Sequence, residues 1–483
     1  MQSSNCALLY REKSQGVTRV DAGRAAGSPA GEVSLAKDQS PNRASRQGNG
    51  TVNCAPAPGR HGQRWILVLG VVVFAVSVAA WSIWHVASFS QPSSMLDLQI
   101  YRWGGLIARH SGDLYGDHFP YYHLRFTYTP AAALVFAAMS AVPVLALRLF
   151  FAFVSIASLA AALWLTWGLL GYRRTAGRAG AALGAAGIAL WLGPVQQTLG
   201  LGQVNVMLML IILADLSLPD DAWPKGIGVG LAAGFKLTPL IFIAYLLLTR
   251  RLRAAAVSLG TFALTITGSL ILLPSQARQY WFDGLFLDSN RTGNNAYVGN
   301  QSLHGALARL VGDTSASELR WAAVPVLVGI AGLVLAAWWS RRGYEMIGIL
   351  TCALTGLLVS PISWDHHWVW AAPALLVAVE IAAGLQTSLK SRWRWAAWPC
   401  LAVLAAPFFT VPQNLVHARV VQGHGAQGIQ LLTGNLYVIT GLIVLGLAGF
   451  GLMAPDRHPE CPQSWDRPLP RAGGERAWVA DPD

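Results

Sequence analysis

The sequence has little charge and no organised cysteine chemistry. Only 12% of the 483 residues are Asp, Glu, Lys or Arg, whereas 54% are hydrophobic and 20 are Trp, which excludes an ordinary soluble domain. The five cysteines are scattered without a Cys-x-x-Cys pair or a Cys/His ligand spacing, so neither a disulfide framework nor a zinc site is predicted. The sequence also lacks a P-loop and a clear internal repeat, which argues against a nucleotide-driven pump and weakens the case for an inverted-repeat transporter.

Long apolar runs recur along most of the chain. Each has close to the length that a helix needs to cross the hydrocarbon core, so we expect an all-α polytopic membrane protein with about twelve transmembrane helices. The expected spans are 65–85, 128–143, 148–170, 180–195, 203–218, 227–248, 255–273, 322–340, 345–361, 367–385, 396–411 and 431–453. The first run is too long and too late for a cleaved signal peptide and is expected to be a retained anchor. Residues 65–453 then form one transmembrane domain between a basic tail at 1–64 and a second tail at 454–483, both expected to be disordered and cytoplasmic.

The distribution of basic residues predicts the orientation of these helices. The positive-inside rule places four clusters of Lys and Arg in the cytoplasm, and both termini then face inward. The clusters are 60–64, 250–253, 341–342 and 390–394. The segments expected to face outward are 86–127, 274–321, 362–366 and 412–430. A fifth basic segment, 172–178, falls outside in this count and disagrees with the other four. The net charge of +12 is explained by basic loops and a basic tail beside anionic lipid, so nucleic acid is not an expected partner.

A carboxylate follows the first apolar run. Asp97 is flanked by apolar residues where a membrane helix leaves the bilayer, a costly place for an acid, and a catalytic base is a common reason for keeping one there. Residues Ile100, Trp103 and Leu106 recur at helical spacing, so 96–110 is expected to form an amphipathic helix on the outer surface of the membrane. The alternative is that Asp97 only complements the dipole at the start of this helix.

A lysine lies within one of the apolar spans. Lys236 comes just before Pro239, which is expected to break the helix of span 227–248. A buried lysine in a membrane helix usually has a partner or lines a pathway, and a phosphate would be a natural partner. The alternative is that the side chain snorkels to the interface.

A third polar group lies between two spans. Asp365, His366 and His367 follow a Pro and are flanked by Trp residues, which places polar groups at the membrane interface. Adjacent histidines on a helix point about 100° apart, so this pair is not expected to bind one metal ion. The alternative is an interfacial aromatic belt with incidental polar residues.

Amide side chains gather in two further stretches. Gln203 and Asn205 lie between two spans, and Asn300 and Gln301 lie in the long outward segment 274–321. Amides suit hydrogen bonding to sugar hydroxyls, and they equally suit helix packing and capping. Neither stretch decides the function alone.

Taken together, these stretches resemble glycosyltransferase family 87, which comprises actinobacterial integral-membrane mannosyltransferases with the GT-C fold. The matching segments are 96–101, 126–130, 202–205, 234–239, 300–303 and 362–367. They follow one another in the family's order within 65–453, and six matches in order are far more specific than any one of them.

The resemblance implies transfer of mannose from polyprenyl-phosphate-mannose to a glycolipid or lipoglycan acceptor, with an α-(1→2) linkage, at the outer face of the plasma membrane. The acid in the first outer loop is the usual base of this fold, and Asp97 matches it. The donor phosphate would be bound by Lys236, with Arg125 or a protonated His366. The other residues expected to contact substrate are Tyr101, Gln203, Asn205, Asn300, Gln301, Trp364, Asp365 and His367.

The chemistry of such a donor agrees with one base and no metal. A lipid phosphate is already a good leaving group, so Asp97 alone would take the proton of the attacking hydroxyl and the configuration would invert. Because the donor carries no pyrophosphate, neither Mg²⁺ nor another cofactor is expected. We also expect Asp97 and one of His366 or His367 to approach within about 10 Å and to share a cavity, with space for one donor phosphate between them and Lys236.

Other readings of the sequence remain open. An arabinofuranosyl- or glucosyltransferase of the same fold would use another polyprenyl-phosphate sugar. A secondary transporter would also need an intramembrane lysine and broken helices, but its site would lie near the midplane instead of in outer loops. A non-catalytic scaffold protein would not need Asp97.

Overall fold

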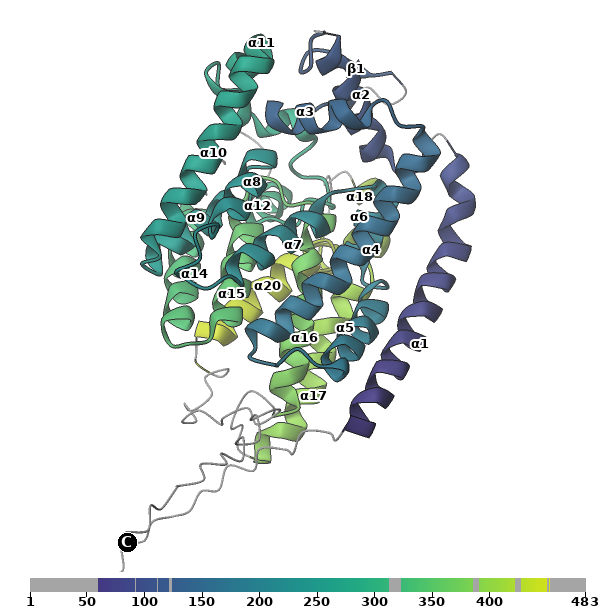
Figure 1. Ribbon diagram of the computed structural model, residues 1–483, viewed down its shortest axis with the longest axis vertical. Coiled ribbons are helices and arrows are strands. Elements are labelled where there is room, and N and C mark those ends of the chain that lie inside the picture. The colour runs from purple at the N-terminus through teal and green to yellow at the C-terminus, as the bar shows by residue number, and fades with distance from the viewer. Residues whose placement is uncertain are drawn as a thin grey trace, which may run out of the picture. The chain divides into compact units, whose positions relative to one another are not determined.

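The computed structural model describes residues 60–91, 93–110, 112–120, 124–311, 323–384, 391–421, 427–449 and 451. Helices dominate this part of the chain (Figure 1). Four of them are long and apolar enough to cross a membrane, namely α1 (Arg60–His85), α4 (Val144–Leu169), α10 (Leu252–Leu272) and α14 (Ala323–Arg341). The all-α membrane architecture is thus confirmed in its coarse form, whereas the count of twelve spans is not confirmed.

Shorter elements make up the rest of the described chain. The helices are α2 (Leu96–Arg109), α3 (Pro130–Met139), α5 (Ala176–Ala189), α6 (Gly193–Leu201), α7 (Asn205–Leu216), α8 (Ile227–Phe235), α9 (Leu240–Leu248), α11 (Pro274–Trp281), α12 (Leu303–Val311), α15 (Glu345–Val359), α16 (Ala371–Ala382), α17 (Ser391–Ala405), α18 (Ala418–Val421), α19 (Ile429–Thr433) and α20 (Leu436–Gly449). The 3-10 turns are η1 (Val86–Ser90), η2 (Leu285–Leu287), η3 (Ser289–Thr292), η4 (Asp365–Trp370), η5 (Ala406–Phe409) and η6 (Pro412–Leu415). One antiparallel pair, β1 (His118–Phe119) with β2 (Leu124–Arg125), completes the fold.

Of the two predicted tails, the structure describes only residues 60–64. Helix α1 begins at Arg60, inside the range expected to be a tail. The predictions for 1–59 and 454–483 lie outside the described residues. The predicted amphipathic helix at 96–110 is confirmed as a helix, α2, and its buried side packs on α3.

Small residues bring α1 against α5. A Cβ added to Gly180 would meet the backbone of Ile66 at 2.4 Å, and one added to Gly187 would meet Phe74 at 3.0 Å, so the two helices approach as closely as glycine permits. The outer side of α1 is apolar and open, with Ile83 and Trp84 82% and 79% exposed. A helix that packs on one neighbour and exposes large apolar side chains is typical of contact with lipid.

The span predicted at 128–143 is wrong. Helix α3 has only 10 residues there, about 15 Å of helix, and it packs against α2 without crossing the bundle. The backbone just after it, at Val142, accepts a hydrogen bond from Arg102 of α2, so α4 begins at the same end of the bundle as α2. We call this end, which carries α2, α3, β1 and α11, the α2 end (Figure 1).

Without a span at 128–143, the basic segment 172–178 no longer conflicts with the positive-inside rule. Helix α4 runs from the α2 end to the opposite end, and α5 then starts beside the start of α1, where Gly177 lies against Gln63. The basic segment 172–178 therefore lies at the same end as the basic cluster 60–64, as the positive-inside rule requires.

The span predicted at 227–248 is broken into two helices. Helix α8 ends at Phe235 and α9 begins at Leu240, with Lys236 in extended backbone between them. Gly234 of α8 packs on Thr265 of α10, so the break lies about 10 Å below the end of α10 at Leu272. Helices α5 and α6 form a similar bent pair, with an angle of 78°.

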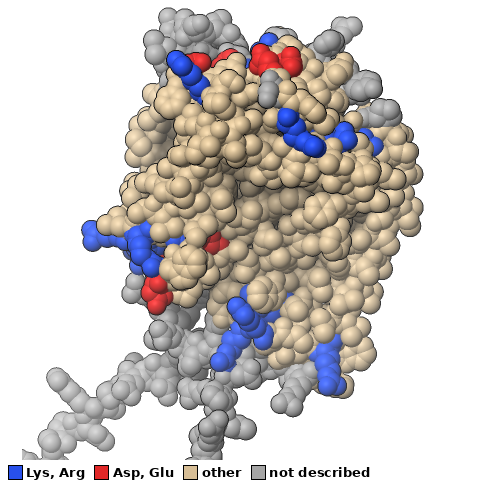
Figure 2. All heavy atoms as spheres, turned by 45° about the horizontal axis from the view of Figure 1, so that its top comes forward, with Lys and Arg blue, Asp and Glu red and all other residues tan. Residues whose placement is uncertain are grey.

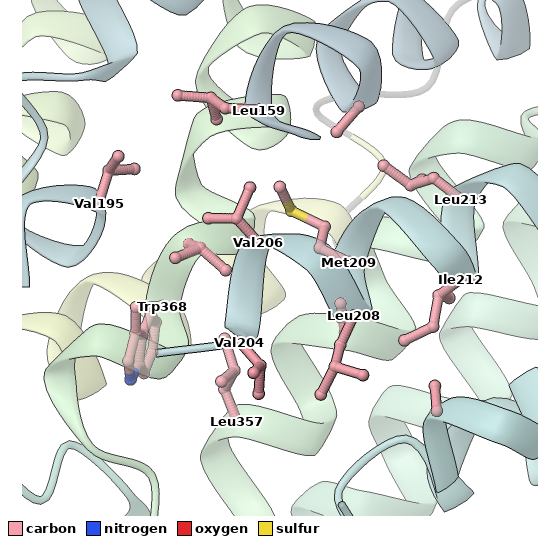
Figure 3. Packing of buried hydrophobic residues seen from close by; sticks show 14 of the residues in the cluster. Leu159, Val195, Val204, Val206, Leu208, Met209, Ile212, Leu213, Leu357 and Trp368 are labelled. Atoms are coloured by element: carbon pink, nitrogen blue, oxygen red, sulfur yellow. The ribbon is translucent and has the colours of Figure 1, made fainter. Parts of the chain in front are cut away.

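Helix α7 lies in the centre of the core (Figure 3). Its side chains Val206, Leu208 and Met209 are buried among residues of other helices, such as Leu159 of α4 and Leu357 of α15. Because α7 is enclosed on several sides, the residues at its start are held firmly.

Charged residues are confined to parts of the protein surface. In the face drawn in Figure 2 most of the surface is neutral, and Lys, Arg, Asp and Glu gather toward the top and along the lower part. This division is typical of a protein with an apolar belt in a bilayer.

Candidate active site

Asp97 lies in the first turn of α2, and its position depends on Gly202, the glycine that ends α6. Gly202 has φ +69°, and a Cβ there would come within 2.7 Å of the Cβ of Leu98. Met95, just before α2, also has a left-handed φ of 47°, and its N–H donates to the carbonyl of Gly200 at 3.1 Å. Glycine at 202 thus lets the end of α6 touch the start of α2, which brings Gln203 to Asp97.

We expect Gly202→Ala to disturb this contact. The new Cβ would force a left-handed residue against Leu98, at a cost of roughly 1 to 3 kcal/mol, and would move Asp97. Both the Tm of the detergent-solubilised protein and its activity should fall. Gly200→Ala is the matched control, because nothing lies within 4 Å of its added Cβ and helical alanine is favoured. Equal Tm and activity in Gly202→Ala and wild type would contradict this reading.

A chain of hydrogen bonds leads from Asp97 to Lys236. Gln203 Nε2 donates to Asp97 Oδ2 at 2.5 Å, and Tyr128 OH donates to Gln203 Oε1 at 2.8 Å. The hydroxyls of Tyr128 and Tyr101 lie 2.7 Å apart. Lys236 Nζ donates to Tyr128 OH at 3.4 Å. The acid and the lysine, which are far apart in the sequence, therefore belong to one polar network.

Lys236 has two further partners. Its Nζ lies 3.0 Å from Asn205 Oδ1 and 2.8 Å from His367 Nε2. Thr129 secures the break in which Lys236 lies, since its hydroxyl donates to the carbonyl of Gly234 at 2.5 Å while accepting from Ala132 N at the start of α3. The helix break thus exposes one lysine to a set of neutral polar groups.

His366 is oriented by a carboxylate. Its Nδ1 lies 3.3 Å from Asp365 Oδ1, and Asp365 Oδ2 accepts from Gln413 Nε2 at 2.5 Å. The carbonyl of His366 accepts from both Thr198 and Asn205 at 2.9 Å, which ties this turn to α6 and α7. The buried Nε2 of His366 has no hydrogen-bond partner among the described residues. An oriented imidazole with an unused nitrogen is available to a ligand.

Asn300 and Gln301 serve the framework. Both are fully buried: Asn300 Oδ1 accepts from Ser363 N at 2.9 Å, and Gln301 Nε2 donates to the carbonyls of Val298 and Gly434 at 2.6 and 2.7 Å. These contacts occupy the amides within the protein and fix the turn before Asp365. The prediction that they bind substrate therefore gains no support from the structure.

Arg125 and Lys236 have different hydrogen-bond partners. Arg125 is exposed on β2, and its Nε donates to His118 Nε2 of β1 at 3.0 Å. Along the chain, the fully buried Phe126 separates it from Tyr128, whose hydroxyl contacts Lys236. The described contacts of Lys236 do not include Arg125, and the expected pairing of these two residues on one phosphate stays a prediction.

An aromatic pair borders the site near Asp365. The ring of Trp364 is partly exposed and meets Tyr297 edge to face, with centroids 5.8 Å apart. Trp364 is also bridged to Asn300 through the backbone. Aromatic faces of this kind suit contact with sugar rings.

The cavity beside Lys236 does not include Asp97. It has a volume of about 60 Å³ and lies between α7, α9, α15 and η4. Asn205, Lys236 and His367 supply polar groups to its mainly apolar wall. Asp97 instead connects to Lys236 through Gln203 and Tyr128, and a cavity that includes Asp97 stays a prediction.

Electrostatics nevertheless couple Asp97 to the other charged groups. Burial raises the pKa of Asp97 above its ordinary value of 3.8, while the charges of His366 and Lys236 and the hydrogen bond from Gln203 oppose that rise. Asp97 therefore interacts electrostatically with both His366 and Lys236. Within the described ranges, no group of three His, Cys, Asp or Glu side chains could hold a metal ion.

Comparison with known proteins gives the family. A protein of Mycobacterium tuberculosis (strain CDC 1551 / Oshkosh), named polyprenol-phosphate-mannose-dependent alpha-(1-2)-phosphatidylinositol pentamannoside mannosyltransferase, is 34% identical over 383 residues, which cover 78% of this chain and 86% of that protein. A protein of the same name in Mycolicibacterium smegmatis (strain ATCC 700084 / mc(2)155) is 32% identical, with coverage of 79% and 91%. The model of glycosyltransferase family 87 matches residues 126–361. The chain belongs to glycosyltransferase family 87. No solved structure matches it.

Membership of family 87 confirms the expected enzyme class, a glycosyltransferase. The family match includes Tyr128, Gln203, Asn205 and Lys236. Asp97 lies outside that match, so its inclusion in the candidate site rests on its hydrogen bond and its charge interactions.

Three residues of the network were not among the predicted site residues. Tyr128 lies in a segment that carried the family resemblance, but a tyrosine beside an apolar run reads equally well as an interfacial aromatic. Thr198 and Gln413 are single polar residues without a pattern, and only their hydrogen bonds to His366 and Asp365 reveal them.

Proposed function

We propose that this enzyme transfers mannose from polyprenyl-phosphate-mannose to a phosphatidylinositol mannoside, forming an α-(1→2) linkage with inversion. The observation that carries the proposal is the joining of Asp97 and Lys236 in one network, because the reaction needs a base and a phosphate-binding cation at the same centre. The names of the mycobacterial relatives support the choice of donor and acceptor.

The proposed reaction is a single displacement. The 2-hydroxyl oxygen of the acceptor attacks the anomeric carbon, and the bond from that carbon to the phosphate oxygen breaks with its electron pair. Asp97 takes the hydroxyl proton, and polyprenyl phosphate leaves as an anion. One new glycosidic bond replaces one phosphoester bond, so no further reactant is needed.

Lys236 and His366 would stabilise the leaving phosphate. Among the described residues, Lys236 Nζ contacts two neutral acceptors and an imidazole and no carboxylate, so its charge remains available to an anion. Protonated on Nε2, His366 would offer a second donor, and Asp365 would hold the ring in place. Trp364 would contact a sugar ring.

The remaining polar residues would position these groups. Gln203 and Tyr101 orient Asp97 and Tyr128, Asn205 holds Lys236, and His367 lies against the same ammonium group. We propose that these residues position Asp97 as the base and Lys236 as the group that binds the donor phosphate.

We further propose that the site faces the outside of the plasma membrane. The α2 end carries Asp97, and the opposite end carries the basic segments 60–64, 172–178 and 250–253, which is the charge asymmetry expected for a cytoplasmic face. A lipid donor could then keep its chain in the bilayer while its sugar enters the site.

We expect the activity to depend on an acid with a raised pKa. Burial raises the pKa of Asp97, and because only the ionised carboxylate accepts a proton, kcat/KM should follow the ionised fraction and fall as the pH drops through that raised pKa. The acid limb should lie above the usual carboxylate range near 3.8. A rate that stays constant down to about pH 4 would contradict this assignment.

The proposed function can be tested with purified protein in detergent. Labelled mannose supplied as polyprenyl-phosphate-mannose should appear in a phosphatidylinositol mannoside acceptor, without any sealed vesicle. GDP-mannose serves as the control donor and should give no product. Transfer from GDP-mannose, or none from the lipid donor, would overturn the proposal.

A further inference from the structure

We propose that Arg125 and Arg291 form a second anion site, at the rim of the α2 end, which binds the phosphodiester of an anionic glycolipid acceptor. The proposal rests on the proposed function, since it assigns the part of that acceptor that lies far from the attacked hydroxyl.

Arg291 is held in place by aromatic rings. Its guanidinium carbon lies 5.0 Å from the ring centroid of Tyr115 and 5.9 Å from that of Tyr280, and these two rings stack with centroids 5.4 Å apart. Its Nη2 donates to the carbonyl of Phe126 at 2.7 Å. A guanidinium has five donors in a rigid fork, and in the part of the chain that the structure describes this arrangement fixes the group while most of its donors stay unused.

Arg125 directly precedes the residue whose carbonyl binds Arg291. Phe126, which receives the hydrogen bond from Arg291, is its sequence neighbour, and Arg125 itself uses Nε to contact His118. Its two Nη groups make no hydrogen bond within the described part of the chain. Both arginines therefore present unused donors in the same region.

The two positive charges are close enough to repel each other. Burial lowers the pKa of Arg291, and the charge of Arg125 lowers it further, whereas Tyr280, Tyr115 and Asp288 act in the opposite direction. Among the described residues neither guanidinium forms an ion pair with a carboxylate. Two neighbouring cations without a paired carboxylate form a site that an anion would stabilise.

The position favours the acceptor over the donor. Arg125 precedes Tyr128 by three residues of non-helical chain, roughly 10 Å if extended, and Arg125 is exposed whereas Tyr128 is buried. The donor has one phosphate, which Lys236 would bind. A phosphatidylinositol mannoside has its phosphate several sugar rings away from its terminal hydroxyl, and so requires a separate cationic site nearer the headgroup layer.

The test compares two acceptors with the same terminal mannose. One is a phosphatidylinositol mannoside, and the other is an alkyl mannoside without phosphate. In Arg125→Gln and Arg291→Gln we expect the KM for the anionic acceptor to rise about tenfold or more, with little change for the neutral acceptor. The dependence of that KM on salt should also weaken in the variants.

Two controls separate the possible outcomes. Arg278→Gln removes an exposed charge from α11 at the same end and should change neither KM. Arg125→Gln is the variant expected to keep the fold, because its side chain is exposed and has one contact. Equal losses with both acceptors, or no loss with either, would overturn the anion site while leaving the proposed function intact. A wild-type enzyme inactive with both acceptors would instead overturn the proposed function, and this site with it.

Discussion

Turnover of an Asp97→Asn variant is expected to fall at least about a hundredfold, because general base catalysis typically contributes that much or more. The amide keeps the shape of the side chain, and its oxygen can still accept the hydrogen bond from Gln203, so the fold and donor binding should survive. It cannot take the proton of the acceptor hydroxyl. The measurement is steady-state transfer from polyprenyl-phosphate-mannose, with donor affinity determined separately.

The matched control is Asp117→Asn, in the same segment between α1 and α3. Asp117 is exposed and lies outside the network, so its replacement should leave turnover within about twofold of wild type. If Asp97→Asn kept more than about a tenth of wild-type turnover, Asp97 would not be the base.

The second large effect concerns Lys236. Removing its charge should weaken binding of polyprenyl phosphate by roughly 10- to 100-fold, as expected for hydrogen bonds that involve a charged group. Lys236→Arg should keep part of the affinity, because it retains a positive charge but changes its geometry. Lys236→Met removes the charge while retaining the apolar stem, and so separates charge from packing.

Direct binding of polyprenyl phosphate to the purified variants provides the measurement. Affinity that is equal in wild type and Lys236→Met would show that the ammonium group does not bind the phosphate. Loss in Lys236→Arg as complete as in Lys236→Met would point to the hydrogen bonds with Asn205 and His367 instead of the charge.

Asp97, Lys236 and His366 could be singled out from the sequence because each breaks the local pattern. A charged side chain in or beside an apolar run is costly, and that cost is visible without a structure. The hydrogen-bond network that connects these residues could not be predicted in the same way. It depends on Gly202, whose left-handed backbone lets α6 meet α2, and on Thr129, which ties α3 to the end of α8.

The errors have physical causes as well. The run at 128–143 is apolar enough for a span, yet α3 is short because Pro130 begins it and Pro143 precedes α4. Asn300 and Gln301 have the residue type of a sugar site, but buried backbone groups in the loop around them needed partners first. Composition alone cannot distinguish an amide that binds substrate from one that binds backbone.

The anomeric configuration of the product tests the central claim most directly. Purified enzyme should be given a β-linked mannosyl phosphate donor and a phosphatidylinositol mannoside acceptor, and the new linkage determined by NMR. A single displacement with Asp97 as base predicts an α-(1→2) linkage, formed with inversion. A β linkage would contradict the account, because retention requires two displacements and a nucleophile that this site does not assign.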